Sequence, residues 1–333
     1  MKILISDSTL RDGNHAVRHQ LTTEQIKIYA RKAEKSNLDI VEVGHGNGLG
    51  ASSSLLGHAA VSDMDMLISA RSQLHKTKLG IHFIPGFGKY SDIDNAVSAG
   101  VDVLRIASHC TESNTTLRYI EQGKDHNKIV FGVLMMSHMA STRELIEQAS
   151  LMEKYGADGI ILMDSAGYYI PDMVRERVDA LVDNLKIQIG FHAHNNLGLA
   201  VANSLAAAIS GASIIDASIM GFGAGAGNTQ LETLVAVFER YGFETNTSFG
   251  QVSEMLPEII ETICHETPYI KLPNIASGLY GLFSGYVPHV QRAAKEFNVN
   301  EFDLYKVLSA RKLVAGQEDI IIEEAIKLAR INS

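Results

Sequence analysis

Two short apolar runs flank a longer helical pattern in the stretch GIILMDSAGYYIPDMVRERVDALVDNLKIQIGFH, which covers residues 159–192. The runs Gly159–Asp164 and Gln188–His192 are mostly apolar and short, as buried strands are. A strand, a helix and a second strand in this order form the repeating unit of a parallel sheet. The stretch therefore predicts an α/β fold.

The same alternation continues from the N-terminus to about residue 240 and yields eight predicted strands. They are Ile3–Asp7, Ile40–Gly44, Leu79–Ile84, Val103–Ala107, Val130–Met135, Gly159–Asp164, Gln188–His192 and Ser213–Ile219. Eight strand–helix units in about 240 residues are typical of a (β/α)8 TIM barrel. A doubly wound sheet would need a glycine-rich dinucleotide turn after its first strand. That position reads Thr9-Leu-Arg-Asp-Gly13, so we predict the barrel.

Local signals mark where helices begin and where the barrel ends. Thr22-Thr-Glu-Gln25 has the pattern of a capping box before the first helix, and Thr229-Gln-Leu-Glu232 has the same pattern before the eighth. Beyond Thr245 the strand pattern fades, and helical patterns follow at Val252–Cys264, Pro288–Phe297 and Ile320–Ile331. We predict a barrel domain over residues 1–245 and a C-terminal helical subdomain over residues 246–333.

Charge and cysteine content exclude several classes of function. The chain has 38 acidic and 29 basic residues, a net charge of −9 and no block rich in lysine or arginine. This argues against nucleic acid or an anionic membrane as the main partner. Cys110 and Cys264 lie far apart, so they offer neither a disulfide framework nor a paired-thiolate zinc site. With no signal-peptide pattern and no membrane span, we expect a cytoplasmic enzyme that acts on small molecules.

Two histidines close predicted strand 7, and an aspartate follows predicted strand 1. His192 and His194 are two residues apart, so both rings point to the same side of a strand. Asp12 lies at the same face, where reactive residues of a barrel gather. Two imidazoles and one carboxylate bind a divalent metal and leave positions open for substrate, in lyases and oxygenases alike. We predict a catalytic metal site; a surface or core role is the alternative for the histidines alone.

Further candidates follow the predicted strands at the same face. Arg11 is the type of group that stabilises an enolate oxygen, or it pairs with barrel carboxylates. His15, three residues beyond Asp12, suits proton transfer near neutral pH, or it forms a hydrogen bond at a helix start. Ser165 either binds a substrate carboxylate or is an ordinary turn serine. The glycine-rich segment 221–228 either approaches a ligand or packs under the eighth helix.

Several motifs together resemble a known superfamily. They are Asp7-Ser-Thr-Leu-Arg-Asp-Gly13, Arg11-Asp-Gly-Asn-His-Ala-Val-Arg-His-Gln20, Ser108-His-Cys-Thr-Glu112, Leu134-Met-Met-Ser-His-Met139, His192-Ala-His-Asn-Asn196, Gly223-Ala-Gly-Ala-Gly-Asn228 and Gly316-Gln-Glu-Asp319. The superfamily contains metal-dependent enzymes that make or break carbon bonds at an enolate, including isopropylmalate and homocitrate synthases, hydroxymethylglutaryl-CoA lyase and the pyruvate aldolases. Within it, the chain looks most like the 4-hydroxy-2-oxovalerate aldolases.

The resemblance implies roles for the residues that match the family's motifs. The metal would be Mn²⁺, with Mg²⁺ or Co²⁺ as alternatives, and its ligands would be Asp12, His192 and His194. Asp12 and His192 would also contact substrate. Arg11 would bind substrate and stabilise the enolate, and His15 would be the catalytic base.

The resemblance also implies residues that shape the substrate site. Ser165 would contact the substrate carboxylate. The family's substrate-facing tyrosine aligns with Phe283 in this chain, so Tyr286 or Tyr280 is the candidate replacement. This difference leaves the length and stereochemistry of the substrate open.

The implied reaction is retro-aldol cleavage of 4-hydroxy-2-oxopentanoate, or of a related 4-hydroxy-2-oxo acid, to pyruvate and acetaldehyde or another aldehyde. The implied partner is an acylating aldehyde dehydrogenase that binds the C-terminal subdomain, although the segment Glu266–Ser277 matches the family poorly. The implied pathway is aromatic hydrocarbon catabolism, and an oligomeric state is compatible with the resemblance.

Two other functions stay open. Asn195 occupies the position where the family usually has a second histidine after the metal pair, and the run His192–Ser204 leans toward acyl-CoA condensing enzymes. The alternative is therefore a Claisen-type acyltransferase that condenses acetyl-CoA with a 2-oxo acid, although those relatives usually carry glutamine where this chain has His15. A non-catalytic scaffold fits less well, because the whole metal and acid–base set is retained.

Overall fold

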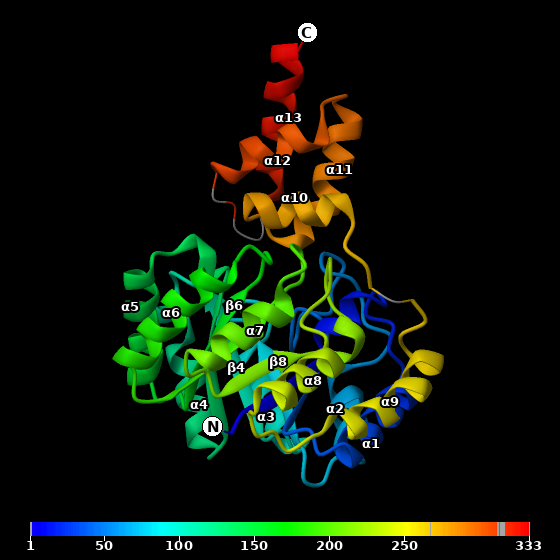
Figure 1. Cartoon of the computed structure of the whole chain (residues 1–333). Coiled ribbons are helices and arrows are strands. Elements are labelled where there is room, and N and C mark those ends of the chain that lie inside the picture. Colours follow the sequence, from blue (N-terminus) through cyan, green and yellow to red (C-terminus); the bar gives the residue numbers. More distant parts are fainter. Residues whose placement is uncertain (1, 267, 312, 314–316, 333) are drawn as a thin grey trace.

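The computed structural model describes residues 2–266, 268–311, 313 and 317–332, so Gly316 of the last family motif lies outside the described residues. Its centre is a closed barrel in which each strand pairs in parallel with the next and β8 pairs with β1. The strands are β1 Leu4–Leu10, β2 Ile40–Val43, β3 Lys78–Phe83, β4 Val103–His109, β5 Ile129–Met135, β6 Gly159–Asp164, β7 Gln188–Ala193 and β8 Ile214–Ala217. The predicted TIM barrel is confirmed (Figure 1).

The strand bounds differ from prediction mainly where β1 and β8 end. β1 continues to Leu10, three residues past the predicted end at Asp7. β8 stops at Ala217, because Ile219 turns into the short 3₁₀ helix η4 (Ile219–Gly221), and its backbone N–H donates to Thr9 Oγ1 at 2.9 Å. A side chain of β1 thus replaces the next ladder bond of β8.

Helices cover the outside of the barrel. They are α1 Thr23–Lys35, α2 Asp63–Arg71, α3 Tyr90–Ser98, α4 Leu117–Asp125, α5 Thr142–Lys154, α6 Pro171–Asn184, α7 Ala200–Ile209 and α8 Leu231–Tyr241. The capping box at Thr22 and Gln25 is confirmed before α1. The capping box predicted before α8 is wrong, because Thr229 Oγ1 donates to Ala200 O and Glu232 accepts from the Met220 N–H. In the described chain, no helix has the length and apolar character of a membrane span.

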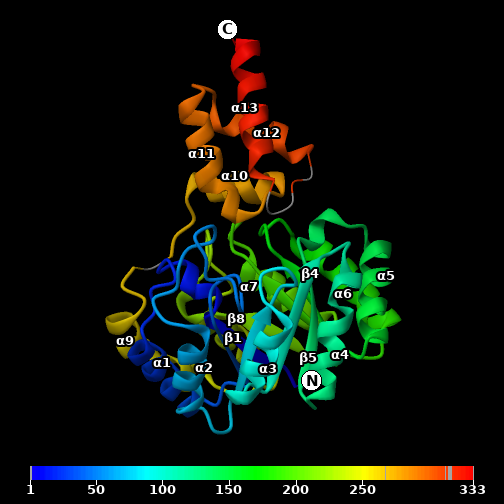
Figure 2. The same cartoon turned by 180° about the vertical axis from the view of Figure 1, so that it is seen from behind.

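The C-terminal helices stand over the carboxyl end of the barrel in both views (Figures 1 and 2). They are α10 Leu272–Tyr280, α11 Val287–Glu296, α12 Glu301–Ser309 and α13 Glu318–Asn332, and they surround a hydrophobic cluster of their own. Asn196 Nδ2 donates to Asn274 O and Ser284 Oγ, and His138 Nε2 lies 2.8 Å from Gly281 O. These contacts join the subdomain to the loops after β7 and β5.

Helix α9 (Phe249–Thr262) packs with the barrel, in a hydrophobic cluster separate from that of the helices that follow it. Val252, Met255 and Ile259 are buried in the barrel's hydrophobic cluster, and α9 contacts α1 and α8. The predicted domain division at residue 245 stays a prediction, and this packing favours a division closer to residue 265.

Candidate metal and active site

The carboxyl ends of β1 and β7 bring three potential metal ligands together. Asp12 begins the 3₁₀ helix η1 (Asp12–His15) after β1, His192 lies in β7 and His194 is the first residue beyond it. One ligand atom from each residue lies within 4.8 Å of the others, and all three residues are buried. The fold therefore assembles the cluster that the sequence predicted.

The glycine-rich loop after β8 holds the Asp12 carboxylate in place. Ala224 N–H and Asn228 Nδ2 donate to Asp12 Oδ2 at 3.0 and 2.8 Å. A Cβ on Gly223 would lie 2.6 Å from Asp12 Oδ2, so only glycine permits this close approach. Burial is the largest single influence and raises the pKa of Asp12, but the charge of Arg11 and the three nearby histidines together outweigh it and hold the pKa well below its usual range. Asp12 is therefore ionised.

Each of the two imidazoles carries a buried nitrogen atom that has no hydrogen-bond partner among the described residues. His192 Nδ1 contacts Asp216 Oδ2 at 2.9 Å, while His192 Nε2 is buried and has no hydrogen-bond partner among the described residues. His194 Nδ1 is likewise buried and unpartnered in the described part of the chain. Burial lowers the pKa of His194 to about 4. His192, whose other nitrogen is held by the Asp216 carboxylate, has the usual form of a metal ligand, and His194 offers a second unpartnered nitrogen, so these residues fit a divalent ion.

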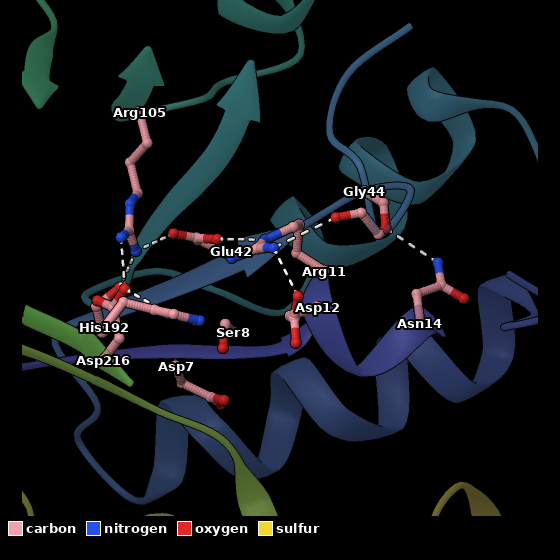
Figure 3. Close-up of polar contacts among 12 residues, drawn as sticks. Asp7, Ser8, Arg11, Asp12, Asn14, Glu42, Gly44, Arg105, His192 and Asp216 are labelled. Carbon is pink, nitrogen blue, oxygen red and sulfur yellow. Dashed lines mark hydrogen bonds and ion pairs between the residues drawn. The ribbon is translucent and has the colours of Figure 1, made fainter. Parts of the chain in front are cut away.

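The Arg11 side chain bridges two carboxylates and leaves one nitrogen free (Figure 3). Its Nε donates to Glu42 Oε2 at 2.8 Å, and its Nη1 donates to Asp12 Oδ1 at 2.9 Å. Nη2 is buried and has no partner within the described ranges. An unpaired guanidinium N–H beside the ligand cluster is suited to a negatively charged oxygen.

His15 lies at the end of η1, half-buried, beside the backbone of Gly46. A Cβ on Gly46 would overlap the His15 ring, so glycine makes room for it. His19 contacts the ring edge-on with centroids 4.9 Å apart, and His45 stacks on His19 at 3.6 Å. Burial lowers the pKa of His15 below its usual value, which favours the neutral form. A neutral imidazole can accept a proton.

Ser165 and Tyr286 lie in different surroundings. Ser165 is buried after β6, and its Oγ accepts a hydrogen bond from the Met136 N–H at 2.9 Å, which leaves the hydroxyl proton for another acceptor. Tyr286 is buried in the hydrophobic cluster of the C-terminal helices, with its ring 5.8 Å from that of Phe283. The predicted substrate contact of Tyr286 stays a prediction.

Comparison with known proteins adds the family. The model of the HMGL-like family matches residues 2–259, and that of the DmpG-like communication domain matches residues 268–330. The chain is 62% identical to the 4-hydroxy-2-oxovalerate aldolase of Burkholderia pseudomallei (strain K96243), over 98% of this chain and 94% of that one. It belongs to the 4-hydroxy-2-oxovalerate aldolase family. Membership of this family places it among the carbon–carbon lyases.

More distant matches extend the comparison. The 4-hydroxy-2-oxovalerate aldolase of Pectobacterium atrosepticum is 51% identical over 99% of this chain and 97% of its own. Among solved structures, the N-terminal domain of a putative aldolase from Bacteroides vulgatus has a TM-score of 0.74 at 22% identity, covering 89% of this chain and 98% of that one. A Rhizobium etli pyruvate carboxylase structure has a TM-score of 0.83 at 18% identity, covering 99% and 32%. These two structures support the barrel fold alone.

Sequence reasoning missed four polar residues that hold the site in this member of the aldolase family. They are Glu42, Arg105, Asp216 and Asn228. The available signal was a charged residue inside an otherwise apolar strand, as in Ile40-Val-Glu-Val43 and Ile214-Ile-Asp-Ala217. Such a residue must find a partner inside the barrel, because an unpaired buried charge is strongly unfavourable.

Proposed function

We propose that the protein is a metal-dependent aldolase that cleaves 4-hydroxy-2-oxopentanoate, or a related 4-hydroxy-2-oxo acid, to pyruvate and an aldehyde. The observation that carries the proposal is the cluster of Asp12, His192 and His194 beside the unpaired Nη2 of Arg11. Identity of 62% to a relative named 4-hydroxy-2-oxovalerate aldolase supports this substrate class.

In this proposal Asp12, His192 and His194 hold a divalent metal, with Mn²⁺ as the first candidate and Mg²⁺ or Co²⁺ as alternatives. A carboxylate and two imidazoles suit such an ion and leave positions for substrate oxygens. When bound, the metal acts as a Lewis acid toward the 2-oxo acid. The free nitrogens of His192 and His194 support this ligand set.

The remaining steps fall to side chains of this chain. The His15 imidazole accepts the proton of the 4-hydroxyl group as the C3–C4 bond breaks and the aldehyde leaves. The bonding electrons form the enolate of pyruvate, whose oxygen accepts a hydrogen bond from Arg11 Nη2. A proton then returns to C3 and completes pyruvate. The Ser165 hydroxyl donates a hydrogen bond to the substrate carboxylate, since its oxygen already accepts one from the Met136 N–H.

We also propose that an acylating aldehyde dehydrogenase docks on α10. Leu272, Ile275 and Leu279 are 67%, 40% and 59% exposed, and their spacing places them on one face of the helix. The segment matches a communication domain, and α10 adjoins the carboxyl end of the barrel, from which an aldehyde would leave. An exposed apolar stripe favours docking of a protein partner, and its position near the aldehyde exit favours a partner that consumes the aldehyde.

A docking experiment tests this surface. The Leu272→Glu/Leu279→Glu variant should no longer co-elute with the dehydrogenase in size-exclusion chromatography, while its pyruvate release stays within about twofold of the parent chain. Ile322→Glu, on the exposed face of α13, is the matched control and should still co-elute. Unchanged co-elution of the α10 variant would assign the partner to another surface.

The cellular setting is a further part of the proposal. Both cysteines are buried and unpaired, which is compatible with a reducing cytoplasm. Catabolism of aromatic compounds supplies 4-hydroxy-2-oxo acids, and we propose that setting for the reaction.

The decisive assay is pyruvate release from 4-hydroxy-2-oxopentanoate with added Mn²⁺, beside an EDTA-treated sample and an Asp12→Ala variant. We expect release that EDTA abolishes, that Mn²⁺ restores in the parent chain and that Asp12→Ala lacks. Metal-independent release would contradict the proposed site. Release of free thiol from acetyl-CoA with a 2-oxo acid, without aldol cleavage, would favour the acyltransferase.

A further inference from the structure

A single buried arginine lies between the two halves of the proposed site. Arg105 lies in β4 and is 1% exposed, with its guanidinium in the interior of the barrel. Its Nη1 pairs with Glu42 Oε1 on β2, and its Nη2 pairs with Asp216 Oδ2 on β8. Strands β4 and β8 lie on opposite sides of the closed barrel, so the side chain spans the interior.

Each carboxylate that Arg105 contacts holds one functional group in turn (Figure 3). Glu42 Oε2 accepts from Arg11 Nε at 2.8 Å, and Asp216 Oδ2 contacts His192 Nδ1 at 2.9 Å. A continuous series of charged contacts therefore runs from Arg11 through Arg105 to His192. The two groups at its ends have the unpartnered atoms that face the proposed substrate and metal, Nη2 and Nε2.

Stability alone does not explain such a residue. The interior of a TIM barrel is normally filled by branched apolar side chains, as Ile161 and Val133 fill it here. A buried ion network is often no more stabilising than apolar residues of the same volume. The guanidinium also leaves its own Nε without a hydrogen-bond partner in the described part of the chain. A role in orienting other groups accounts for the charge.

We propose that Arg105 is a positioning residue that couples the metal ligand His192 to the enolate-binding Arg11. The inference rests on the proposed function of this site. Through Asp216 it orients His192 so that Nε2 points to the ion, and through Glu42 it orients the Arg11 fork. The positions of His192 and Arg11 thus both depend on Arg105, so a substitution of Arg105 alters metal binding and turnover together.

Substitution of Arg105 by lysine tests the coupling. A lysine ammonium lacks the planar fork and does not hold two carboxylates in fixed positions. We expect Arg105→Lys to raise the Kd for Mn²⁺ about ten- to hundredfold in equilibrium dialysis of the metal-stripped protein. We also expect kcat at saturating Mn²⁺ to fall by about the same factor, because Arg11 is misplaced.

A matched control separates this effect from a general loss of structure. Arg71→Lys removes the fork of another arginine, which bonds Asp102 and the carbonyls of Leu74 and Gly100 outside the site. It should leave both Kd and kcat within about twofold. Circular dichroism and thermal unfolding of each variant check that the fraction assayed is folded.

A double-mutant cycle provides a second test that does not need a folded Arg105 variant. Glu42→Gln disturbs the connection from Arg105 to Arg11, and Asp216→Asn disturbs the connection from Arg105 to His192; these two connections are the arms of the network. If Arg105 connects the arms, the combined effect on the Kd for Mn²⁺ departs from the product of the single effects by about threefold or more.

Three results are distinguishable. The coupling would be overturned if the effect of the double mutant on the Kd for Mn²⁺ agrees within about twofold with the two single effects multiplied together. It would also be overturned if the Arg105→Lys enzyme has an unchanged Kd and kcat. Recovery of full kcat at saturating Mn²⁺ in Arg105→Lys would show that Arg105 does not orient Arg11 through Glu42. The proposed coupling of Arg11 to His192 would then be wrong. A parent chain that neither binds Mn²⁺ nor releases pyruvate would instead refute the proposed function.

Discussion

The two ends of the barrel carry ion pairs of opposite character. At the amino ends of the strands, Arg71 pairs with Asp102 just before β4, and Lys124 pairs with Asp158 just before β6. Their side chains are 26–38% exposed. Exposed pairs of this kind contribute about 0–1 kcal/mol each, because water screens them.

At the carboxyl end the charges are almost fully buried. Arg11 pairs with Asp12 and Glu42, and the side chains of all three are at most 5% exposed. Removal of such groups from water is unfavourable by several kcal/mol per ion, so each charge must be compensated by close partners. The comparison indicates that ion pairs at the amino end stabilise loops, whereas the buried charges at the carboxyl end serve the proposed reaction. Substitutions at the two ends should therefore affect different measurements.

Arg11→Met should give the largest effect. It removes the Nη2 donor from the proposed enolate site, and loss of one such donor lowers kcat about 10²- to 10³-fold. Pyruvate release at saturating substrate and Mn²⁺ measures it. A loss of less than about tenfold would indicate that Arg11 serves the ion-pair network and not the reaction.

The same substitution at the other end sharpens the contrast. Arg71→Met should leave kcat within about twofold and lower the free energy of unfolding by roughly 1 kcal/mol, since it removes partly exposed bonds to Asp102 and two carbonyls. Urea unfolding and the pyruvate assay on one preparation compare both. A large loss of turnover in this variant would contradict the division between the ends.

Asn228→Ala should give the next largest effect. Asn228 Nδ2 donates to Asp12 Oδ2 at 2.8 Å, and partners of metal ligands typically change metal affinity or activity about 10- to 100-fold when lost. We expect the Kd for Mn²⁺ to rise about tenfold. Asn184→Ala is the control, because within the described ranges its side-chain amide donates only to Ala180 O on the surface of α6. Equal effects of the two variants on the Kd for Mn²⁺ would contradict a role of Asn228 in supporting the metal ligand Asp12.

The parts of this site that were predictable follow from position along a strand. Asp12, His192 and His194 lie at or just beyond the carboxyl ends of predicted strands, and those ends meet at one face in any TIM barrel. The run of apolar residues marks the strand because a strand buried on both faces has no polar alternation. The local sequence pattern was therefore sufficient to predict the strands and the three candidate metal ligands.

Other features depend on contacts between residues far apart in sequence. Thr229 and Glu232 have the pattern of a capping box, but Ala200 O and the Met220 N–H engage their side chains instead. The bridge from Arg105 to Asp216 joins residues 111 positions apart across the barrel. No local pattern encodes such pairings, so the sequence alone did not predict them.

Asp7 lies in β1 between the two ends and should give a pH-dependent effect on stability. Burial raises the pKa of Asp7 from 3.8 to about 6, so the folded state favours the protonated acid. A raised folded pKa means that stability is lost as pH rises from about 4 to 6 and stays lost above. Asp7→Asn should remove this loss and stabilise the fold at pH 7 by up to roughly 3 kcal/mol. Urea unfolding from pH 4 to 8 tests it, and parallel curves for parent and variant would contradict it.

Glu34, near the amino end of the barrel, should show the smallest effect and the opposite sign. Burial raises the pKa of Glu34, but hydrogen bonds from the backbone N–H groups of His75, Lys76 and Thr77 outweigh it and lower the pKa below its usual value. A lowered folded pKa gives stability that is present above the unfolded pKa and is lost as pH falls through the folded value. Because Glu34 is only partly buried, solvent screening limits the gain at pH 7 to a few tenths of a kcal/mol. Glu34→Gln should therefore lower the unfolding free energy slightly at pH 7 and not at pH 3, whereas an equal difference at both pH values would mean that the carboxylate charge has no part in holding this loop.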